Sequence, residues 1–492
     1  MHLPIFYSAL LLTLVNLLLR AVGTSFQVYL SGQIGAAGIG LLQLVMSVGG
    51  FATIASIAGI RTASMYLTAE ELGRKRKENV TWVLSGCFHY SILCSLLVGC
   101  LLYVFAPLLA ESWIGNSRTA DALRLFAAFL PIICLTNVMT GYFTAANRIG
   151  TLAAVEVAEQ LVSMAVTLWA LHRFADNDPV RACQCVILGS SLSGLVTLLC
   201  LVLLRLKEQP HSGPRISMSR RLQDTAVPLA LADILKSGIN TAENLMVPSR
   251  LARNIRIVDP LAAFGTVSGM VFPLLMFPAC ILFGLAELLI PELARCAAAG
   301  SSGRIAYLTK KSLRIALLYG LIFGGLEYLL ADRLCLRLYG SPEAGWFLKL
   351  YALLIPMLYC DAITDAMTKG LGQQKICVRY NILTSALDVI FLWFLLPGFG
   401  MTGYYISFTL THGVNFLLSF RLLLKITGGT FSLHRPILAL AAVILAVWGA
   451  GTFSSDVAVT AAFLLLTGSL WCLLGVAGWE DLRWFRGIIR KK

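Results

Sequence analysis

Apolar stretches of about twenty residues recur from one end of this sequence to the other, and they constrain the fold more than any other feature. A helix of that length crosses the hydrocarbon core of a bilayer, where helices and closed barrels alone satisfy their backbone polar groups. Only 13% of the 492 residues are charged, against about 25% in soluble domains. The chain is therefore predicted to be an all-α, polytopic membrane protein.

We predict about fourteen transmembrane helices. Their ranges are 5–30, 34–60, 81–106, 122–145, 151–172, 183–204, 226–249, 261–290, 313–331, 346–366, 379–396, 401–424, 436–453 and 457–478. The opening MHLPIFYSALLLTLVNLLLR lacks the basic segment and the small-residue cleavage site of a signal peptide. We therefore expect it to be retained as the first span.

Basic residues are distributed unevenly over the connections between these stretches. With the N-terminus inside, the cytoplasmic connections and tail hold 26 of the 39 Lys and Arg residues, and the external connections hold 10. This is the positive-inside pattern, which predicts a multi-pass plasma membrane protein with both termini in the cytoplasm. The net charge of +14 then reflects topology and contact with anionic membrane lipids, and we expect no nucleic-acid partner.

A polar interruption from Lys207 to Asp224 separates six predicted helices from eight. The sequence LLLRAVG (17–23) resembles DILKSGI (233–239) beyond the interruption, and each places a cation in an apolar helix. Transporters are often built from two related bundles with a site between them. We predict two pseudo-symmetric six-helix lobes, 1–225 and 226–425, followed by two helices and a basic tail in 426–492.

The sequence lacks the motifs of common enzymes and of metal-binding sites. It contains neither the GxxxxGK[ST] phosphate loop nor HExxH. The thirteen cysteines lie almost entirely in apolar stretches without a CxxC pair, as expected for buried free thiols. We predict a transport protein rather than an enzyme, with no metal and no cofactor.

Cations inside the apolar stretches are the first candidates for function. A charge at the centre of a span costs about 2.5–3.5 kcal/mol, so such residues usually face a cavity or a partner. Arg20 lies too deep in its span to snorkel easily, and we expect it to bind an anion, with an ion pair to Glu287 as the alternative. Arg61 and Lys236 are further candidate cations of a cleft, although Lys236 has Asp233 one helical turn away as a potential partner.

The sequence contains further charged residues whose assignment to a functional site rests on weaker arguments. Three arginines follow the 226–249 span on the predicted outer side: Arg250, Arg253 and Arg256. They either contact an anion as it leaves the cleft or form a solvated loop. Acidic residues within or beside spans are candidate ion-coupling groups or charge partners: Asp233, Glu287, Asp361, Asp365 and Asp388. Glu156 and Glu159 lie about one turn into the 151–172 span, where carboxylates favour the positive N-terminus of a helix, and we expect a structural role for both. Glu243 and Glu327 carry no assigned role.

Several stretches resemble a known family. AVPLALADILKSGINTAENLMVPSRL (226–251) and AFGTVSGMVFPLLMFPACILFGLAELLIPELARC (263–296) resemble two consecutive helices of the stage V sporulation protein B-like flippases. These polysaccharide biosynthesis flippases belong to the multidrug/oligosaccharidyl-lipid/polysaccharide (MOP) exporter superfamily and are related to lipid II flippases. Four other stretches resemble the family in the same order: 30–48, 141–162, 369–382 and 395–408.

This resemblance implies a transporter that moves a polyprenyl-pyrophosphate-linked saccharide, such as a peptidoglycan precursor, from the inner to the outer leaflet. Its partners are then the lipid-linked saccharide, membrane lipids and cell-wall synthesis enzymes, and we expect a monomer. Related lipid II flippases use arginines of the first helix, and Arg20 matches the first such position. Phe26 and Gln27 stand near the second, and Arg61 replaces a proline common in the family.

Two other functions stay open at this point. A multidrug or cation antiporter of the same superfamily would bind cations through acidic residues. The first two predicted helices contain no carboxylate before Glu70, whereas Asp361, Asp365 and Asp388 permit an acidic site later in the chain. A membrane scaffold for cell-wall synthesis, without transport, is the second alternative.

Overall fold

The described residues of a computed structural model are 5–57, 59–74, 76, 78–175, 178–207, 219–428 and 434–476. Across these ranges the elements are all helical, and none of them is a strand. The chain divides into two compact units by its internal contacts: unit 1 is Met1–Met270 with Ser385–Ser407, and unit 2 is Val271–Thr384 with Phe408–Lys492.

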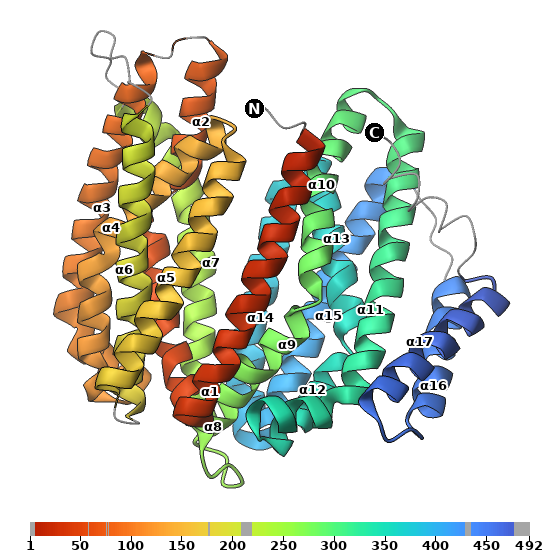
Figure 1. The fold of residues 1–492 in the computed structure, drawn as a ribbon. Helices are drawn as coiled ribbons and strands as arrows, with labels where there is room; N and C mark the ends of the chain where they lie inside the picture. The colour runs from red at the N-terminus through yellow and green to blue at the C-terminus, as the bar shows by residue number, and fades with distance from the viewer. Residues whose placement is uncertain are drawn as a thin grey trace. The chain divides into compact units, whose positions relative to one another are not determined.

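Unit 1 contains most of the long helices of the N-terminal half (Figure 1). They are α1 (Ile5–Ile57), α2 (Ile60–Gly73), α3 (Asn79–Leu109), α4 (Ala120–Ala145), α5 (Ile149–Phe174), α6 (Pro179–Leu206) and α7 (Ser219–Leu251), followed by the short α8 (Pro260–Gly265). Short turns of π or 3-10 helix adjoin them: η1 (Ala110–Ile114), η2 (Ser117–Thr119) and η3 (Thr266–Val271). Parts of α14 (Gln374–Phe399) and α15 (Met401–Thr427) complete unit 1.

Unit 2 contains the remaining helices and the other parts of α14 and α15. They are α9 (Phe272–Met276), α10 (Ala279–Ala298), α11 (Ser302–Tyr339), α12 (Pro342–Ala352), α13 (Ile355–Gly370), α16 (His434–Ala450) and α17 (Asp456–Leu473). The predicted lobes 1–225 and 226–425 are defined by a repeat in the sequence, whereas the two units are defined by contacts within the folded chain. The lobes, with the segment 426–492, stay a prediction.

Every predicted span overlaps one or more of these helices, and the all-helical membrane fold is confirmed. The count of fourteen is not confirmed. By length and composition, eight helices of the described ranges are able to cross a membrane, or up to ten if two bent pairs each form one span. The bends are 62° between the α8–α9 segment and α10, and 55° between α12 and α13. Four predicted spans account for the difference between fourteen and ten. Two predicted spans share α1, α7 and α15 are not apolar enough for the criterion, and α16 is short.

Helix α1 is broken at Gly35, whose φ is 68° and ψ 179°. Glycine adopts a positive φ at little cost because it has no Cβ. The 53 residues of α1 would extend about 80 Å as one straight helix, far more than the roughly 30 Å of a hydrocarbon core. The break therefore divides α1 into two segments that match the predicted spans 5–30 and 34–60.

Glycines bring α8 into backbone contact with the second segment of α1. A Cβ on Gly265 would lie 2.0 Å from the carbonyl oxygen of Ala36, and a Cβ on Gly40 would lie 2.3 Å from that of Leu261. Lipid tails are as apolar as the side chains they replace, so helices in a membrane associate through close packing of small residues. These two glycines therefore position α8, and η3 after it, against α1.

We expect Gly265→Ala to destabilise the folded protein by about 1–3 kcal/mol, because the added methyl group forces two backbones apart. Thermal unfolding in detergent would measure the change. Gly194→Ala in α6 is the matched control, since a Cβ there meets no atom within 4 Å. Equal melting temperatures of the two variants would contradict this account of the α1–α8 contact.

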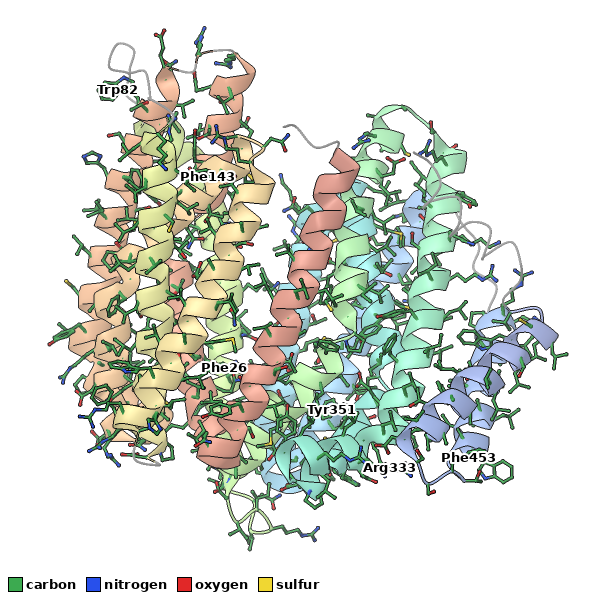
Figure 2. All side chains as sticks on the ribbon, viewed as in Figure 1. Phe26, Trp82, Phe143, Arg333, Tyr351 and Phe453 are labelled. Carbon is green, nitrogen blue, oxygen red and sulfur yellow. The ribbon has the colours of Figure 1, made fainter. Side chains whose placement is uncertain are left out.

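The core of unit 1 lies where α2, α3 and α4 meet. Its buried residues include Leu67, Val83 and Phe143, and Phe143 has no exposed surface (Figure 2). In unit 2, α11 packs against α16 and α17. A Cβ on Gly325 of α11 would lie 2.5 Å from the ring of Phe463 in α17. This contact brings the last described helices onto the side of α11.

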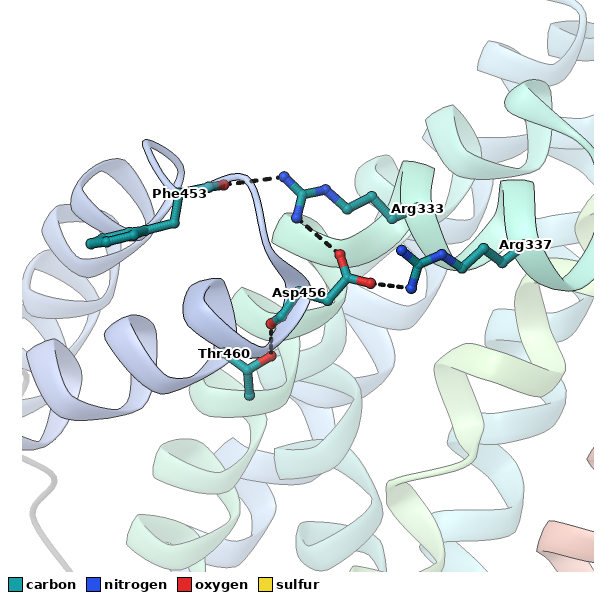
Figure 3. Close-up of polar contacts among 5 residues, drawn as sticks. All are labelled: Arg333, Arg337, Phe453, Asp456 and Thr460. Atoms are coloured by element: carbon teal, nitrogen blue, oxygen red, sulfur yellow. Dashed lines mark hydrogen bonds and ion pairs between the residues drawn. The ribbon is translucent and has the colours of Figure 1, made fainter.

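A polar clamp fastens the start of α17 to α11 (Figure 3). Nη1 of Arg333 donates to Oδ1 of Asp456 over 2.9 Å, and its Nη2 donates to the carbonyl oxygen of Phe453 over 3.2 Å. Arg337 donates to the other carboxylate oxygen of Asp456. One carboxylate thus holds two guanidinium groups that lie one turn apart on α11.

We expect Asp456→Asn to loosen α16 and α17 from α11, because it removes the charge that holds both arginines. Hydrogen exchange should become faster in residues 434–473 and stay unchanged in α1 to α6. Asp121→Asn is the control, since Asp121 forms an ion pair with Arg124 on its own helix and, within the described ranges, with no residue of another helix. Unchanged exchange in the Asp456 variant would show that apolar packing alone secures these helices.

Candidate functional site

The three predicted cleft cations all belong to unit 1, and each has an exposed side chain. Arg20 lies in the first segment of α1, Arg61 is the second residue of α2, and Lys236 lies in the middle of α7. Among the described residues, neither Arg20 nor Lys236 has a hydrogen-bond or ion-pair partner. In a membrane helix such a charge requires a watery cavity, a head group or a bound anion.

Backbone contacts join the start of α2, which carries Arg61, to α7, which carries Lys236. Gly59, which caps α2 with a φ of 73°, touches α7: a Cβ on it would lie 2.5 Å from the carbonyl oxygen of Ala226 and 3.2 Å from the amide of Ala230. Lys236 follows Ala230 by six residues, or about 9 Å along the helix. The start of α2 therefore contacts the first third of α7, about 9 Å along the helix from Lys236.

Arg61 differs from the other two cations because it has an acidic neighbour. The Arg61 guanidinium attracts the carboxylate of Glu156 in α5. A Cβ on Gly141 of α4 would lie 2.6 Å from the carbonyl oxygen of Arg61, which shows how closely α2 packs there. Glu159, one turn beyond Glu156, accepts a hydrogen bond from Thr197 Oγ1 over 3.0 Å. Both carboxyls of α5 thus have partners within unit 1.

Two ion pairs were the alternatives to anion binding by Lys236 and Arg20: Asp233 with Lys236, and Glu287 with Arg20. Asp233 and Lys236 are both exposed on α7 and do not pair with each other, and Lys236 has no ion-pair partner among the residues that the structure describes. Glu287 is exposed on α10 of unit 2, whereas Arg20 belongs to unit 1. A pair between Glu287 and Arg20 stays a prediction.

The two carboxylates of α13 have partners inside unit 2. Asp361 accepts a hydrogen bond from Asn415 Nδ2 of α15 over 3.1 Å. Asp365 pairs with Lys369 one turn later on the same helix, at 2.6 Å. Asp361 is therefore a hydrogen-bond partner of Asn415, and Asp365 is a charge partner of Lys369.

Asp388 is a buried carboxyl of unit 1 that pairs with the half-buried Glu243. Its side chain is 5% exposed, shares a hydrogen bond with the carboxyl of Glu243 in α7, and accepts one from Ser407 Oγ of α15 over 2.5 Å. Tyr404 of α15 lies beside both carboxyls and is hydrogen-bonded to Ser268 of η3. Two carboxyls in hydrogen-bond contact require a shared proton or a bridging cation, since two buried like charges repel strongly.

Glu243 was among the intramembrane charges of the sequence, but its partner was not predictable. It lies 145 residues before Asp388, and neither residue is part of a metal or catalytic motif. Three helices and η3 bring their oxygen atoms together, and oxygen atoms are the ligands that hard cations prefer. The pair is therefore the strongest candidate in unit 1 for coupling to a proton or to a cation such as sodium.

We expect sodium to raise the melting temperature of the wild-type protein at alkaline pH, where a cation replaces the proton between Glu243 and Asp388. Glu243→Gln keeps a hydrogen-bonding side chain but removes one ionisable group, so the increment should disappear. Glu327→Gln is the control, since Glu327 is a buried acid in unit 2, and it should retain the increment. The same sodium response in both variants would exclude the pair as the cation site.

The three arginines at the predicted outer side occupy different places. The guanidinium of Arg250, at the end of α7, lies over the ring of Trp393 in α14, and this arginine is only 6% exposed. Arg253 and Arg256 are exposed in the connection to α8. Asn254, between them, donates to the carbonyl oxygen of Pro397 over 3.0 Å. Arg250 and Arg253 line a pocket of about 340 Å³ of which Arg256 is not part.

Comparison with known sequences agrees with the resemblance to the flippase family. The family model for polysaccharide biosynthesis proteins matches residues 6–254. Stage V sporulation protein B of Bacillus subtilis (strain 168) is 23% identical over 406 residues, which cover 80% of this chain and 78% of that protein. Sporulation protein YkvU of the same organism is 23% identical over 228 residues, 45% of this chain and 51% of that protein.

Solved structures show the same fold. The lipid II flippase MurJ in an inward closed conformation matches with a TM-score of 0.72 and 12% identity, over 96% of this chain and 99% of that chain. An inward-facing MATE-family multidrug resistance transporter of the MOP superfamily matches with a TM-score of 0.68 and 15% identity, over 85% and 98%. Since the family model covers half of the sequence, the chain belongs to the polysaccharide biosynthesis protein family and has the fold of MOP-superfamily transporters.

Proposed function

We propose that this protein is a flippase that carries a polyprenyl-pyrophosphate-linked saccharide from the inner to the outer leaflet by alternating access. The observation that carries the proposal is the pair of exposed cations Arg20 and Lys236. Arg20 lies in the apolar first segment of α1 and Lys236 lies in the more polar α7, both in unit 1, and neither has an ion-pair partner in the described ranges. Arg61 adds a third cation, which Glu156 compensates in part.

The physical problem that such a protein solves explains this arrangement. A pyrophosphate head group with its sugars cannot enter roughly 30 Å of hydrocarbon without losing its hydration, and burying an unpaired charge is prohibitive. Fixed cations replace the lost water. A guanidinium suits this role because its planar fork binds phosphate oxygens in pairs, while the prenyl chain remains in lipid.

An energy source is required if transport is to run in one direction. The membrane potential contributes about 2.3 kcal/mol per elementary charge per 100 mV. The Glu243–Asp388 pair offers a second source, because binding a proton or a cation on one side and releasing it on the other couples ion flow to the movement of the helices. We propose that this pair, rather than Asp361 or Asp365, is the coupling site.

The proposed orientation rests on the whole sequence, in which the predicted cytoplasmic connections and tail hold 26 Lys and Arg residues and the external connections hold 10. Arg74 and Arg76 lie in the α2–α3 connection and Arg148 lies in the α4–α5 connection, at one end of unit 1, and the α7–α8 connection lies at the opposite end (Figure 1). The positive-inside rule weighs short connections near the span ends. We propose that the end with the α2–α3 connection faces the cytoplasm and that both termini do so too.

The test is leaflet exchange of a fluorescent lipid-linked oligosaccharide in proteoliposomes. We expect wild-type protein to accelerate exchange, and we expect Arg20→Ala and Lys236→Ala each to slow it at least about tenfold, since a hydrogen bond to a charged group contributes about 1.5–3 kcal/mol. Arg74→Ala is the control, because Arg74 is exposed in a connection and pairs with Glu70.

Two other outcomes would overturn parts of this proposal. Exchange that stays fast in both the Arg20 and Lys236 variants would exclude these cations as the head-group site. A wild-type protein that exchanges no lipid but takes up a cationic dye against a proton or sodium gradient would be an antiporter, and the Glu243–Asp388 pair would then serve that activity.

A further inference from the structure

A pocket at the end of α7 combines charge with apolar surface. It has a volume of about 340 Å³ and is lined by α7, by Trp113 of η1 and by Trp393 of α14, all in unit 1. Arg250 and Arg253 supply its charge, and Leu245 and Met246 supply apolar surface. The volume falls within the range of about 300–1,000 Å³ that is typical of small-ligand sites.

The charge in this pocket is not balanced by the protein. Arg250 is 6% exposed, and a guanidinium keeps its proton in a protein. Trp393 provides a cation–π contact, which stabilises the cation but leaves its charge in place. Arg253 lies close enough to repel Arg250, and neither arginine forms an ion pair with a residue that the structure describes.

The acidic residues on the lining helices do not change this balance. Glu243 follows the lining residue Ala242 on α7 but shares its hydrogen bond with Asp388 of α14. Glu111 of η1 is exposed and forms no ion pair within the described ranges. The pocket therefore presents two positive charges, one of them buried, for which an anion is the missing partner.

The remaining lining identifies the kind of anion. Trp113 is 55% exposed and Trp393 49% exposed, and tryptophan prefers the boundary between head groups and hydrocarbon. A soluble anion would gain little from this apolar surface. We propose that the pocket binds the phosphate or pyrophosphate group of an amphipathic lipid whose chain lies along the exposed tryptophans and α7.

The ligand has two potential sources. Under the proposed function, on which this inference rests for its orientation, the pocket lies at the outer end of unit 1. A polyprenyl pyrophosphate carrier would then meet it as the head group leaves the protein. A resident anionic phospholipid of the same leaflet offers the same phosphate chemistry. The shared feature is a phosphate ester attached to a long apolar chain.

Native mass spectrometry of the full-length protein, released from phosphatidylcholine nanodiscs, tests the proposal with three probes. These are undecaprenyl pyrophosphate, phosphatidylglycerol and inorganic pyrophosphate. We expect at least one lipid probe to bind, and we expect Arg250→Gln and Arg253→Gln each to weaken that binding at least about tenfold. Arg253 is exposed, so its variant remains informative even if the Arg250 variant folds poorly.

Arg173→Gln is the matched control. This arginine is exposed in the last turn of α5, at the same end of unit 1 as the pocket, and its variant should bind as the wild-type protein does. Preference for undecaprenyl pyrophosphate would identify the carrier lipid as the ligand, and equal binding of phosphatidylglycerol would identify a resident lipid. Both outcomes support the phosphate site.

Three results would overturn the proposal: no binding of either lipid, equal binding in the Arg253 and Arg173 variants, or tighter binding of inorganic pyrophosphate than of both lipids. The proposed transport function fails separately, through absence of leaflet exchange in proteoliposomes. A protein that binds the lipid through Arg250 and Arg253 without exchanging it would keep this site and lose the flippase activity.

Discussion

The cost of placing a charge inside an apolar helix determines the organisation of this protein. Each charged group in a span needs a partner, a proton or water. Asp365 has Lys369, Arg61 has Glu156, and the buried Asp388 shares a proton or a cation with Glu243. Arg20 and Lys236 alone among the predicted cleft cations have no such compensation in the described ranges, and this difference is the reason for proposing these two residues as the head-group site.

The close contacts of small residues hold these charges in place. Gly40 and Gly265 bring α8 against α1, and Gly59 brings α2 against α7. Between them, Thr241 Oγ1 donates to the carbonyl oxygen of Ser47 over 3.2 Å, and Asn244 Nδ2 donates to Ser47 Oγ over 3.0 Å. Helix α7 is thereby hydrogen-bonded to α1 on either side of Glu243, at positions that follow Lys236 in the chain. These contacts join the second segment of α1, the start of α2 and helices α7 and α8 within unit 1.

Much of this organisation was predictable from the sequence, because hydropathy and charge act locally. The helical membrane fold, the family and the cations Arg20 and Lys236 all follow from short stretches. Contacts between distant residues were not predictable. The pairing of Glu243 with Asp388, the stacking of Arg250 on Trp393 and the bends before α10 and α13 each depend on which helices become neighbours, and a single apolar sequence does not encode that in any local pattern.

The departure at Phe26 and Gln27 from the related lipid II flippases has a structural counterpart. Gln27 Nε2 donates to the carbonyl oxygen of Gly269 in η3 over 3.2 Å, so its side chain attaches the first segment of α1 to the region that also holds Ser268. A cation at this position would lose that contact and would repel Arg20, two helical turns earlier. Gln27 therefore serves the packing of α1 within unit 1, and Lys236 and Arg61 stay the predicted further cations of this unit.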